Sequence, residues 1–154
     1  KKNIWIYQLK DIKTLMSPRN TKTGNVLENM VLPSLKNGGY EYKIQQIVGV
    51  RPGGGKHKVD VIADKEGNKF LVSLKWQQVG GTAEQKVPFE IICLLEVVLA
   101  DPNYKKAYLV LGGEGWTLRN YYISGELKKH LQYTGRIEIT TLEKFVALAN
   151  QGKL

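Results

Sequence analysis

Three strand-like stretches joined by two short turns constrain the fold more than any other feature of this sequence. Residues 40–50, 57–64 and 69–77 are rich in β-branched and aromatic side chains, and polar and apolar residues alternate along much of their length. The glycine-containing stretches RPGGGK and KEGN separate them. Turns this short join antiparallel neighbours, because a parallel pair needs a crossover of about a dozen residues or more. The region is therefore expected to be an antiparallel meander.

Helical patterns flank this meander on both sides. Leu27, Val31 and Leu35 recur at the spacing of one helix face, which predicts an amphipathic helix near 22–36 that ends at the glycines of NGG. After the glycines of VGG, a second apolar stripe runs through residues 82–101 and predicts a longer helix. The meander is thus expected to lie between two helices in the chain.

The C-terminal part of the chain adds more elements of both kinds. The apolar run 107–113 is typical of a buried strand, 118–132 predicts a helix, 136–141 a last strand and 142–150 a closing helix. The order is α-β-β-β-α-β followed by α-β-α, which indicates one α/β domain over residues 1–154. The N-terminal IWIYQLKDIKTL fits either a strand or a short helix.

The charge of the chain indicates a polyanionic partner. Lys and Arg number 23 against 14 Asp and Glu, a net charge of +9. A basic domain of this size typically binds nucleic acid, an acidic membrane surface or an acidic protein. No apolar run reaches the roughly 18 residues of a membrane span, so no transmembrane segment is expected. The single cysteine, Cys93, allows no disulfide within the chain, which favours a cytoplasmic location.

Polar side chains interrupt two of the predicted strands. Ser73, Lys75 and Gln77 are two residues apart, so all three point to the same face of the third strand. Asp60 lies between two valines on the preceding strand, where a buried carboxylate is costly unless it is paired or binds a cation. An acid and a lysine on adjacent strands meet if they share a face. A cross-strand ion pair would explain them without any further role.

These residues and the order of the elements resemble the PD-(D/E)xK nuclease superfamily over roughly residues 22–113. The resemblance implies a restriction-endonuclease-like αβββαβ core, with a central mixed sheet flanked by helices. Asp60 corresponds to the metal-binding acid and Lys75 to the lysine of the motif. Glu28 corresponds to the glutamate that many members carry on the first helix, and Gln77 to a glutamine that often follows the lysine.

The sequence departs from the family pattern at Ser73, where an aspartate or glutamate is expected. Two acids are generally needed, because Mg²⁺ prefers hard oxygen ligands and one carboxylate holds it weakly. Some restriction enzymes of the superfamily also show Ser-x-Lys and take the missing acid from the following helix. By helical periodicity, Glu84 points toward the sheet and Glu90 lies on the flank of the helix. The number of residues between Lys75 and Glu90, however, is nearer to the spacing that those Ser-x-Lys enzymes show. Both stay candidates for the metal, because Pro88 can reset the helical phase between them.

The resemblance implies a Mg²⁺-dependent DNA endonuclease in which Mn²⁺ can replace Mg²⁺. Restriction-type cleavage leads, because the Ser-x-Lys variant is familiar there. The alternatives are a homing endonuclease, a junction resolvase and a catalytically inactive nucleic-acid-binding module. The expected partners are double-stranded DNA and, given the small size, a second copy of the chain or a larger subunit. The residues expected to contact DNA phosphates are Arg19, Arg51, Lys56, His57 and Lys58.

Overall fold

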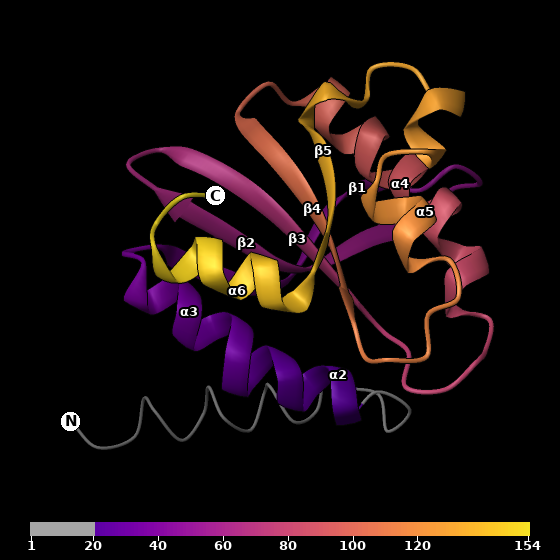
Figure 1. Cartoon of the computed structure of the whole chain (residues 1–154). Helices are drawn as coiled ribbons and strands as arrows, with labels where there is room; N and C mark the ends of the chain where they lie inside the picture. Colours follow the sequence, from indigo (N-terminus) through magenta and orange to yellow (C-terminus); the bar gives the residue numbers. More distant parts are fainter. Residues whose placement is uncertain (1–20) are drawn as a thin grey trace.

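A five-stranded mixed sheet forms the centre of the computed structural model, which describes residues 21–154 (Figure 1). Neighbouring strands follow the order of the chain, β1-β2-β3-β4-β5. The first three pair antiparallel, which confirms the predicted meander, and β3, β4 and β5 pair parallel. The strands are β1 (Glu41–Val50), β2 (Lys56–Lys65), β3 (Asn68–Trp76), β4 (Tyr104–Gly112) and β5 (Ile137–Thr141).

The helices before and after the meander are also confirmed. One continuous helical stretch consists of α2 (Thr21–Val26), a π-helical turn at Leu27–Val31 and α3 (Leu32–Asn37). The helix α4 (Ala83–Ala100) connects β3 to β4, as a parallel crossover requires. The chain therefore has the αβββαβ order that the sequence predicted.

The helix expected over 118–132 is wrong in its extent. This region holds the short α5 (Arg119–Ile123) and a 3₁₀ turn at Leu127–His130, with a further 3₁₀ turn at Thr134–Arg136. Gly125 interrupts the helix because its φ of 86° is left-handed, a conformation that a right-handed helix cannot include. The last strand follows, and α6 (Leu142–Asn150) closes the chain as predicted.

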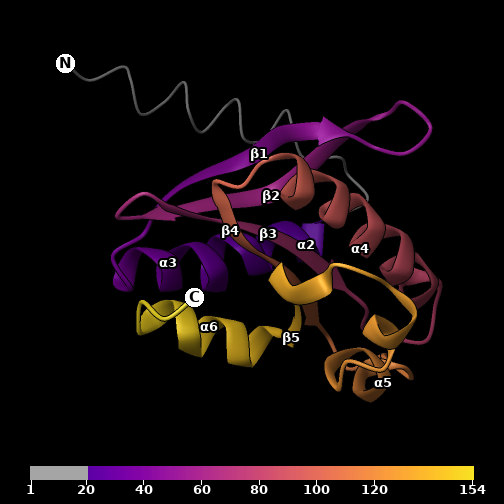
Figure 2. The same ribbon diagram turned by 90° about the horizontal axis from the view of Figure 1, so that it is seen from above.

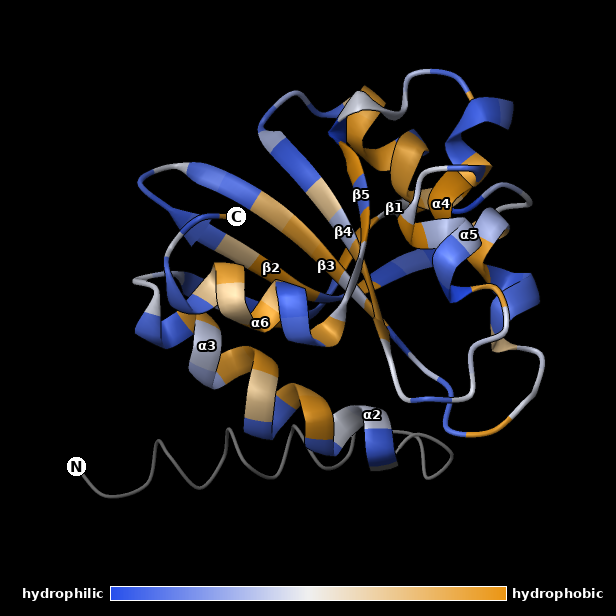
Figure 3. Cartoon of the chain, viewed as in Figure 1, coloured by the Kyte–Doolittle hydropathy of each residue, from blue (hydrophilic) through white to orange (hydrophobic). Residues whose placement is uncertain are grey.

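Helices cover both faces of the sheet, and each face has its own hydrophobic core (Figure 2). On one face α4 and α5 pack against the sheet through residues such as Ile91, Leu94 and Tyr122. On the other face α3 and α6 pack through residues such as Leu35 and Phe145. Hydrophobic residues accordingly concentrate in the central strands and in α4 (Figure 3). Among residues 21–154, none of the helices has the length and apolar character needed to cross a membrane.

Two parts of the sequence analysis cannot be compared with this fold. The N-terminal stretch IWIYQLKDIKTL and Arg19 both lie outside the described residues. That residues 1–154 form one domain also stays a prediction.

The contact between α3 and α6 depends on a glycine at the end of α3. Gly38 has an ordinary φ of −78°, but a Cβ there would lie 1.8 Å from the carbonyl oxygen of Ala149 on α6. We expect Gly38→Ala to lower the free energy of unfolding by about 1–3 kcal/mol, as overpacking typically does. Urea denaturation measures this change. Gly55→Ala is the matched control, because a Cβ at Gly55 meets nothing within 4 Å; equal effects in the two variants would contradict the packing argument.

Candidate active site

Asp60 lies where the pairing between β2 and β3 stops. The ladder between these strands ends at the pair Val61 and Val72. Two residues further along β3, the N–H of Leu74 donates to Asp60 Oδ2 at 2.6 Å. The carboxylate thus accepts a backbone hydrogen bond at the point where the two strands part. Val59 belongs to the core on the α4 face and Val61 to the opposite core, so the alternation of β2 also changes at Asp60.

Gln45 on β1 contacts the same carboxylate and was not singled out from the sequence. Its Nε2 donates to Asp60 Oδ1 at 3.4 Å. The backbone of Gln45 has a φ of 51°, an uncommon conformation for a residue with a side chain. A left-handed residue inside a strand costs free energy and is often found at functional sites. The two consecutive glutamines at 45 and 46, which break the alternation of β1, were the available signal.

Glu90 on α4 gathers four polar side chains around its buried carboxylate, which is only 4% exposed. Its Oε1 accepts a hydrogen bond from Ser73 Oγ at 3.1 Å and lies 3.4 Å from His57 Nε2. Its Oε2 lies 3.2 Å from Arg51 Nη2 and 3.8 Å from Lys75 Nζ. Of the two candidate acids on this helix, Glu90 is therefore the one that lies beside Ser73 and Lys75.

Burial and neighbouring charges set the protonation of the two carboxyls in opposite directions. Burial disfavours the charged form of Glu90, but His57, Lys75 and Arg51 outweigh it and lower its pKa to about 2. Burial raises the pKa of Asp60, and the Leu74 N–H and the charge of Lys75 offset part of this effect. Lys75 stabilises the charged form of both carboxyls, so the three groups act on one another electrostatically.

Glu84, the other candidate acid, binds a loop through its carboxylate. Its carboxylate accepts hydrogen bonds from the backbone N–H of Thr117 and of Leu118 and from Thr117 Oγ1. Its carbonyl oxygen accepts a 2.6 Å hydrogen bond from the Tyr122 hydroxyl. That carbonyl is available because Pro88, four residues later, has no N–H to donate. No hydrogen bond or ion pair among the described residues joins Glu84 to Asp60 or Lys75.

Gln77 directly follows β3, and its amide is already occupied by hydrogen bonds within the protein. Its Nε2 donates to the carbonyl of Gly115 at 2.7 Å, and its Oε1 accepts from the N–H of Ala83 at 3.1 Å. The side chain is buried. These bonds connect the end of β3 to the start of α4, and they leave the amide little capacity to orient water or a ligand.

The remaining predicted residues divide between the cluster and the surface. Glu28 is exposed on the first helical stretch, and within the described part of the chain no hydrogen bond or ion pair links it to the cluster. Lys56 and Lys58 are exposed on β2, where DNA can reach them. Arg51 points to Glu90. His57 is 0% exposed, so its side chain is not at the surface where the expected contact with DNA would form.

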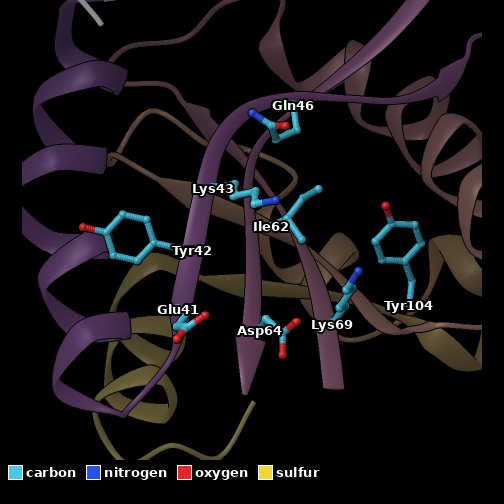
Figure 4. A pocket seen from close by; sticks show the side chains of 8 residues that line it. All are labelled: Glu41, Tyr42, Lys43, Gln46, Ile62, Asp64, Lys69 and Tyr104. Carbon is cyan, nitrogen blue, oxygen red and sulfur yellow. The ribbon is translucent and has the colours of Figure 1, made fainter. Parts of the chain in front are cut away.

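A cavity of about 320 Å³ lies elsewhere on the sheet and does not include the cluster (Figure 4). Its lining comes mainly from β1, β2 and β3 and includes two lysines, Lys43 and Lys69, and two acids, Glu41 and Asp64. These charges balance, so the cavity presents no excess charge to a polyanion. The polar cluster around Glu90 is therefore the better candidate for chemistry.

A metal at this cluster would have two carboxylates from the protein. Across residues 21–154 there is no group of three or more His, Cys, Asp and Glu side chains arranged to hold an ion. Asp60 and Glu90 nevertheless supply hard oxygen atoms, the ligand type that Mg²⁺ and Mn²⁺ prefer. Mg²⁺ usually keeps several waters and uses one or two carboxylates together with substrate phosphates. The donor set therefore fits such an ion when substrate completes it.

The lowered pKa of Glu90 predicts a specific pH dependence of stability. Its charged form stabilises the fold fully above the ordinary value of 4.5, and this stabilisation is lost as the pH falls toward about 2. The shift corresponds to at most about 3 kcal/mol in the free energy of unfolding. We expect that free energy, measured in EDTA, to fall more steeply between about pH 5 and pH 3 in the wild type than in Glu90→Gln. Parallel profiles would contradict the assignment.

The family model for the PD-(D/E)XK nuclease superfamily domain matches residues 19–153. No curated protein matches the sequence. Among solved structures, the chain is similar to AF1548, a protein of unknown function, with a TM-score of 0.46 and 18% identity over 72% of this chain and 54% of that chain.

A second similar structure is the small subunit, R.BspD6I2, of the heterodimeric restriction endonuclease R.BspD6I. The TM-score is 0.44 and the identity 14%, over 92% of this chain and 73% of that chain. These two likenesses are distant. The family match, in contrast, spans almost the entire sequence and coincides with the observed αβββαβ order. The chain belongs to the PD-(D/E)XK nuclease superfamily.

Proposed function

We propose that this chain is a divalent-metal-dependent endonuclease that hydrolyses phosphodiester bonds of double-stranded DNA. The observation that supports this most is the arrangement around Glu90. Ser73 stands where the family motif has an acid, and its hydroxyl hydrogen-bonds a glutamate that reaches it from α4. Lys75 of the motif contacts the same glutamate. The helix thus supplies the carboxylate that the strand lacks.

Asp60 and Glu90 are the proposed metal ligands. Each is fixed by contacts to the protein, Asp60 by the Leu74 N–H and Glu90 by Ser73 and His57. A divalent cation bound there, Mg²⁺ or Mn²⁺, would polarise the scissile phosphate and lower the pKa of nearby water. The two carboxylates belong to different layers of the fold, so both β2 and α4 define the site.

Lys75 is the proposed catalytic cation. Its side chain is 28% exposed and its ammonium lies 3.8 Å from Glu90 Oε2, so it is both held in place and accessible to substrate. An ammonium in this position orients the attacking water or offsets the negative charge that develops on the phosphate. Lys56 and Lys58, exposed on β2, are proposed to contact flanking phosphates, which would make DNA binding fall steeply with salt.

Restriction-type cleavage by a dimer, or together with a larger subunit, is the specific form we propose. A restriction enzyme cuts both strands, and a single set of Asp60, Lys75 and Glu90 serves one strand at a time. Supercoiled plasmid and branched DNA distinguish this form from a junction resolvase, which would prefer the branched substrate. A protein that shifts DNA in a gel but leaves it intact in every metal would instead be a binding module.

We expect the wild type to cut supercoiled plasmid with Mg²⁺ or Mn²⁺ and not with EDTA. Lys75→Ala should slow cutting by about 100-fold or more, because it removes a charge from the reacting phosphate. Its DNA affinity in EDTA should change little. Lys69→Ala, which removes an exposed lysine from the same strand, is the matched control and should cut as the wild type does. Normal cutting by Lys75→Ala would reject the site.

The two glutamates of α4 provide a second comparison. We expect Glu90→Gln to lose about 100-fold or more in cleavage rate, because it removes a charged metal ligand. Glu84→Gln should lose far less activity and instead lower the thermal midpoint, because it weakens the attachment of the loop at Thr117 and Leu118. Cleavage rates corrected for the folded fraction measure the difference. The reverse order of the two rates would assign the metal to Glu84.

A further inference from the structure

The two carboxylate oxygens of Glu90 have different partners, and Arg51 binds Oε2. Oε1 is bound by the hydroxyl of Ser73 and the buried ring of His57. Oε2 instead meets two cations, the guanidinium of Arg51 at 3.2 Å and the ammonium of Lys75 at 3.8 Å. One oxygen is therefore held by buried groups of the core, and the other by side chains that are 30% and 28% exposed.

We propose that Arg51 is a placeholder cation that couples metal binding to DNA binding. In the free protein it neutralises Glu90 at Oε2. When DNA arrives, the guanidinium moves to a phosphate and leaves this oxygen to the divalent cation. This inference rests on the proposed function, and it adds an order of events: the metal is bound tightly only after the substrate.

The charges of the cluster support this coupling. Asp60 and Glu90 together balance Arg51 and Lys75, so a divalent cation entering the free protein would leave an excess of two positive charges. Like charges a few ångströms apart repel strongly where water is partly excluded. A phosphodiester brings negative charge to the same place and accepts the guanidinium. Arginine suits this exchange, because its planar fork binds carboxylate and phosphate in similar geometry.

The position of Arg51 allows it to move, whereas Lys75 is fixed. Arg51 follows β1 and opens the turn to β2, where Gly53 and Gly54 have left-handed φ values of 96° and 98°. Among the described residues, the only other hydrogen bond of its side chain is a weak one of 3.7 Å to Cys93 Sγ. Lys75 stands on β3, which pairs with β4 at this level. The exposed Lys56 and Lys58 lie on the same hairpin as Arg51, so DNA bound by them would approach the guanidinium.

The test is Mn²⁺ binding to the full chain without DNA, measured by isothermal titration and by the loss of the free-ion electron paramagnetic resonance signal. Because coupling free energies between sites typically change affinity 5–150-fold, we expect Arg51→Gln to bind Mn²⁺ about 10-fold more tightly than the wild type. Lys86→Gln is the matched control. It removes an exposed lysine one helical turn before Glu90 and should change the affinity by less than about 2-fold.

A second measurement follows from the proposed exchange partner. In EDTA, Arg51→Gln should bind a short duplex about 10-fold more weakly than the wild type, because a phosphate contact is lost. If Arg51→Gln proves unfolded by circular dichroism, Arg51→Lys takes its place. Lysine keeps the positive charge, but it lacks the planar guanidinium and is shorter, so it should bind Glu90 Oε2 less well. The Arg51→Lys variant should therefore bind Mn²⁺ more tightly than the wild type.

The outcomes separate this inference from the proposed function. A wild type that cuts DNA with Mg²⁺, together with an Arg51→Gln variant that binds Mn²⁺ no more tightly than the wild type, overturns the placeholder role alone. If the wild type neither cuts DNA nor binds Mn²⁺ in the presence of a duplex, both proposals fail. If Lys86→Gln binds Mn²⁺ as tightly as Arg51→Gln does, the gain in affinity comes from the lower net charge alone. That result would also overturn the inference.

Discussion

The hydrogen bond from the Leu74 N–H to Asp60 is the interaction on which the rest of the cluster depends. A sheet normally satisfies that donor with a backbone carbonyl of the neighbouring strand. Here the pairing of β2 and β3 has already ended, and a side chain takes the carbonyl's place. The donor stays satisfied while the two strands part, and a carboxylate is held beside the face that bears Ser73 and Lys75. Continued pairing would leave no room for a polar group between the strands.

Glu90 shows why a buried carboxylate persists on a helix that is otherwise part of the core. Burial alone would make the charged form unfavourable, but four polar side chains from three segments surround it. A cluster of this kind contributes little net stability compared with a hydrophobic replacement, because desolvation of the ions offsets their attraction. The cluster is therefore better accounted for by the proposed function than by a contribution to folding stability.

The order of elements was predictable from the sequence, but the partners within the cluster were only partly so. Apolar periodicity reports which face of a strand or helix is buried, and it correctly placed Ser73 and Lys75 on one face of β3, where both reach Glu90. It cannot report contacts from distant segments. Thr117 and Leu118, more than thirty residues further along the chain, donate hydrogen bonds to Glu84. The glutamate that periodicity predicted to point toward the sheet therefore binds a loop. Likewise, His57 belongs to a basic stretch of sequence and was therefore expected to contact DNA. The fold instead buries it against Glu90, which the sequence does not reveal.

In the proposed site, a serine on β3 stands at the position of the second acid, and one half of the ligand set comes from the layer that covers the sheet. In a chain with both acids on strands, backbone hydrogen bonds would fix their separation. Here side-chain packing between α4 and the sheet fixes it instead, through Ile91 and Leu94. The spacing of the two carboxylates then depends on how the buried side chains of this interface pack. Evolution could adjust the size or identity of the accepted ion by altering a buried methyl group, without touching any residue that contacts it.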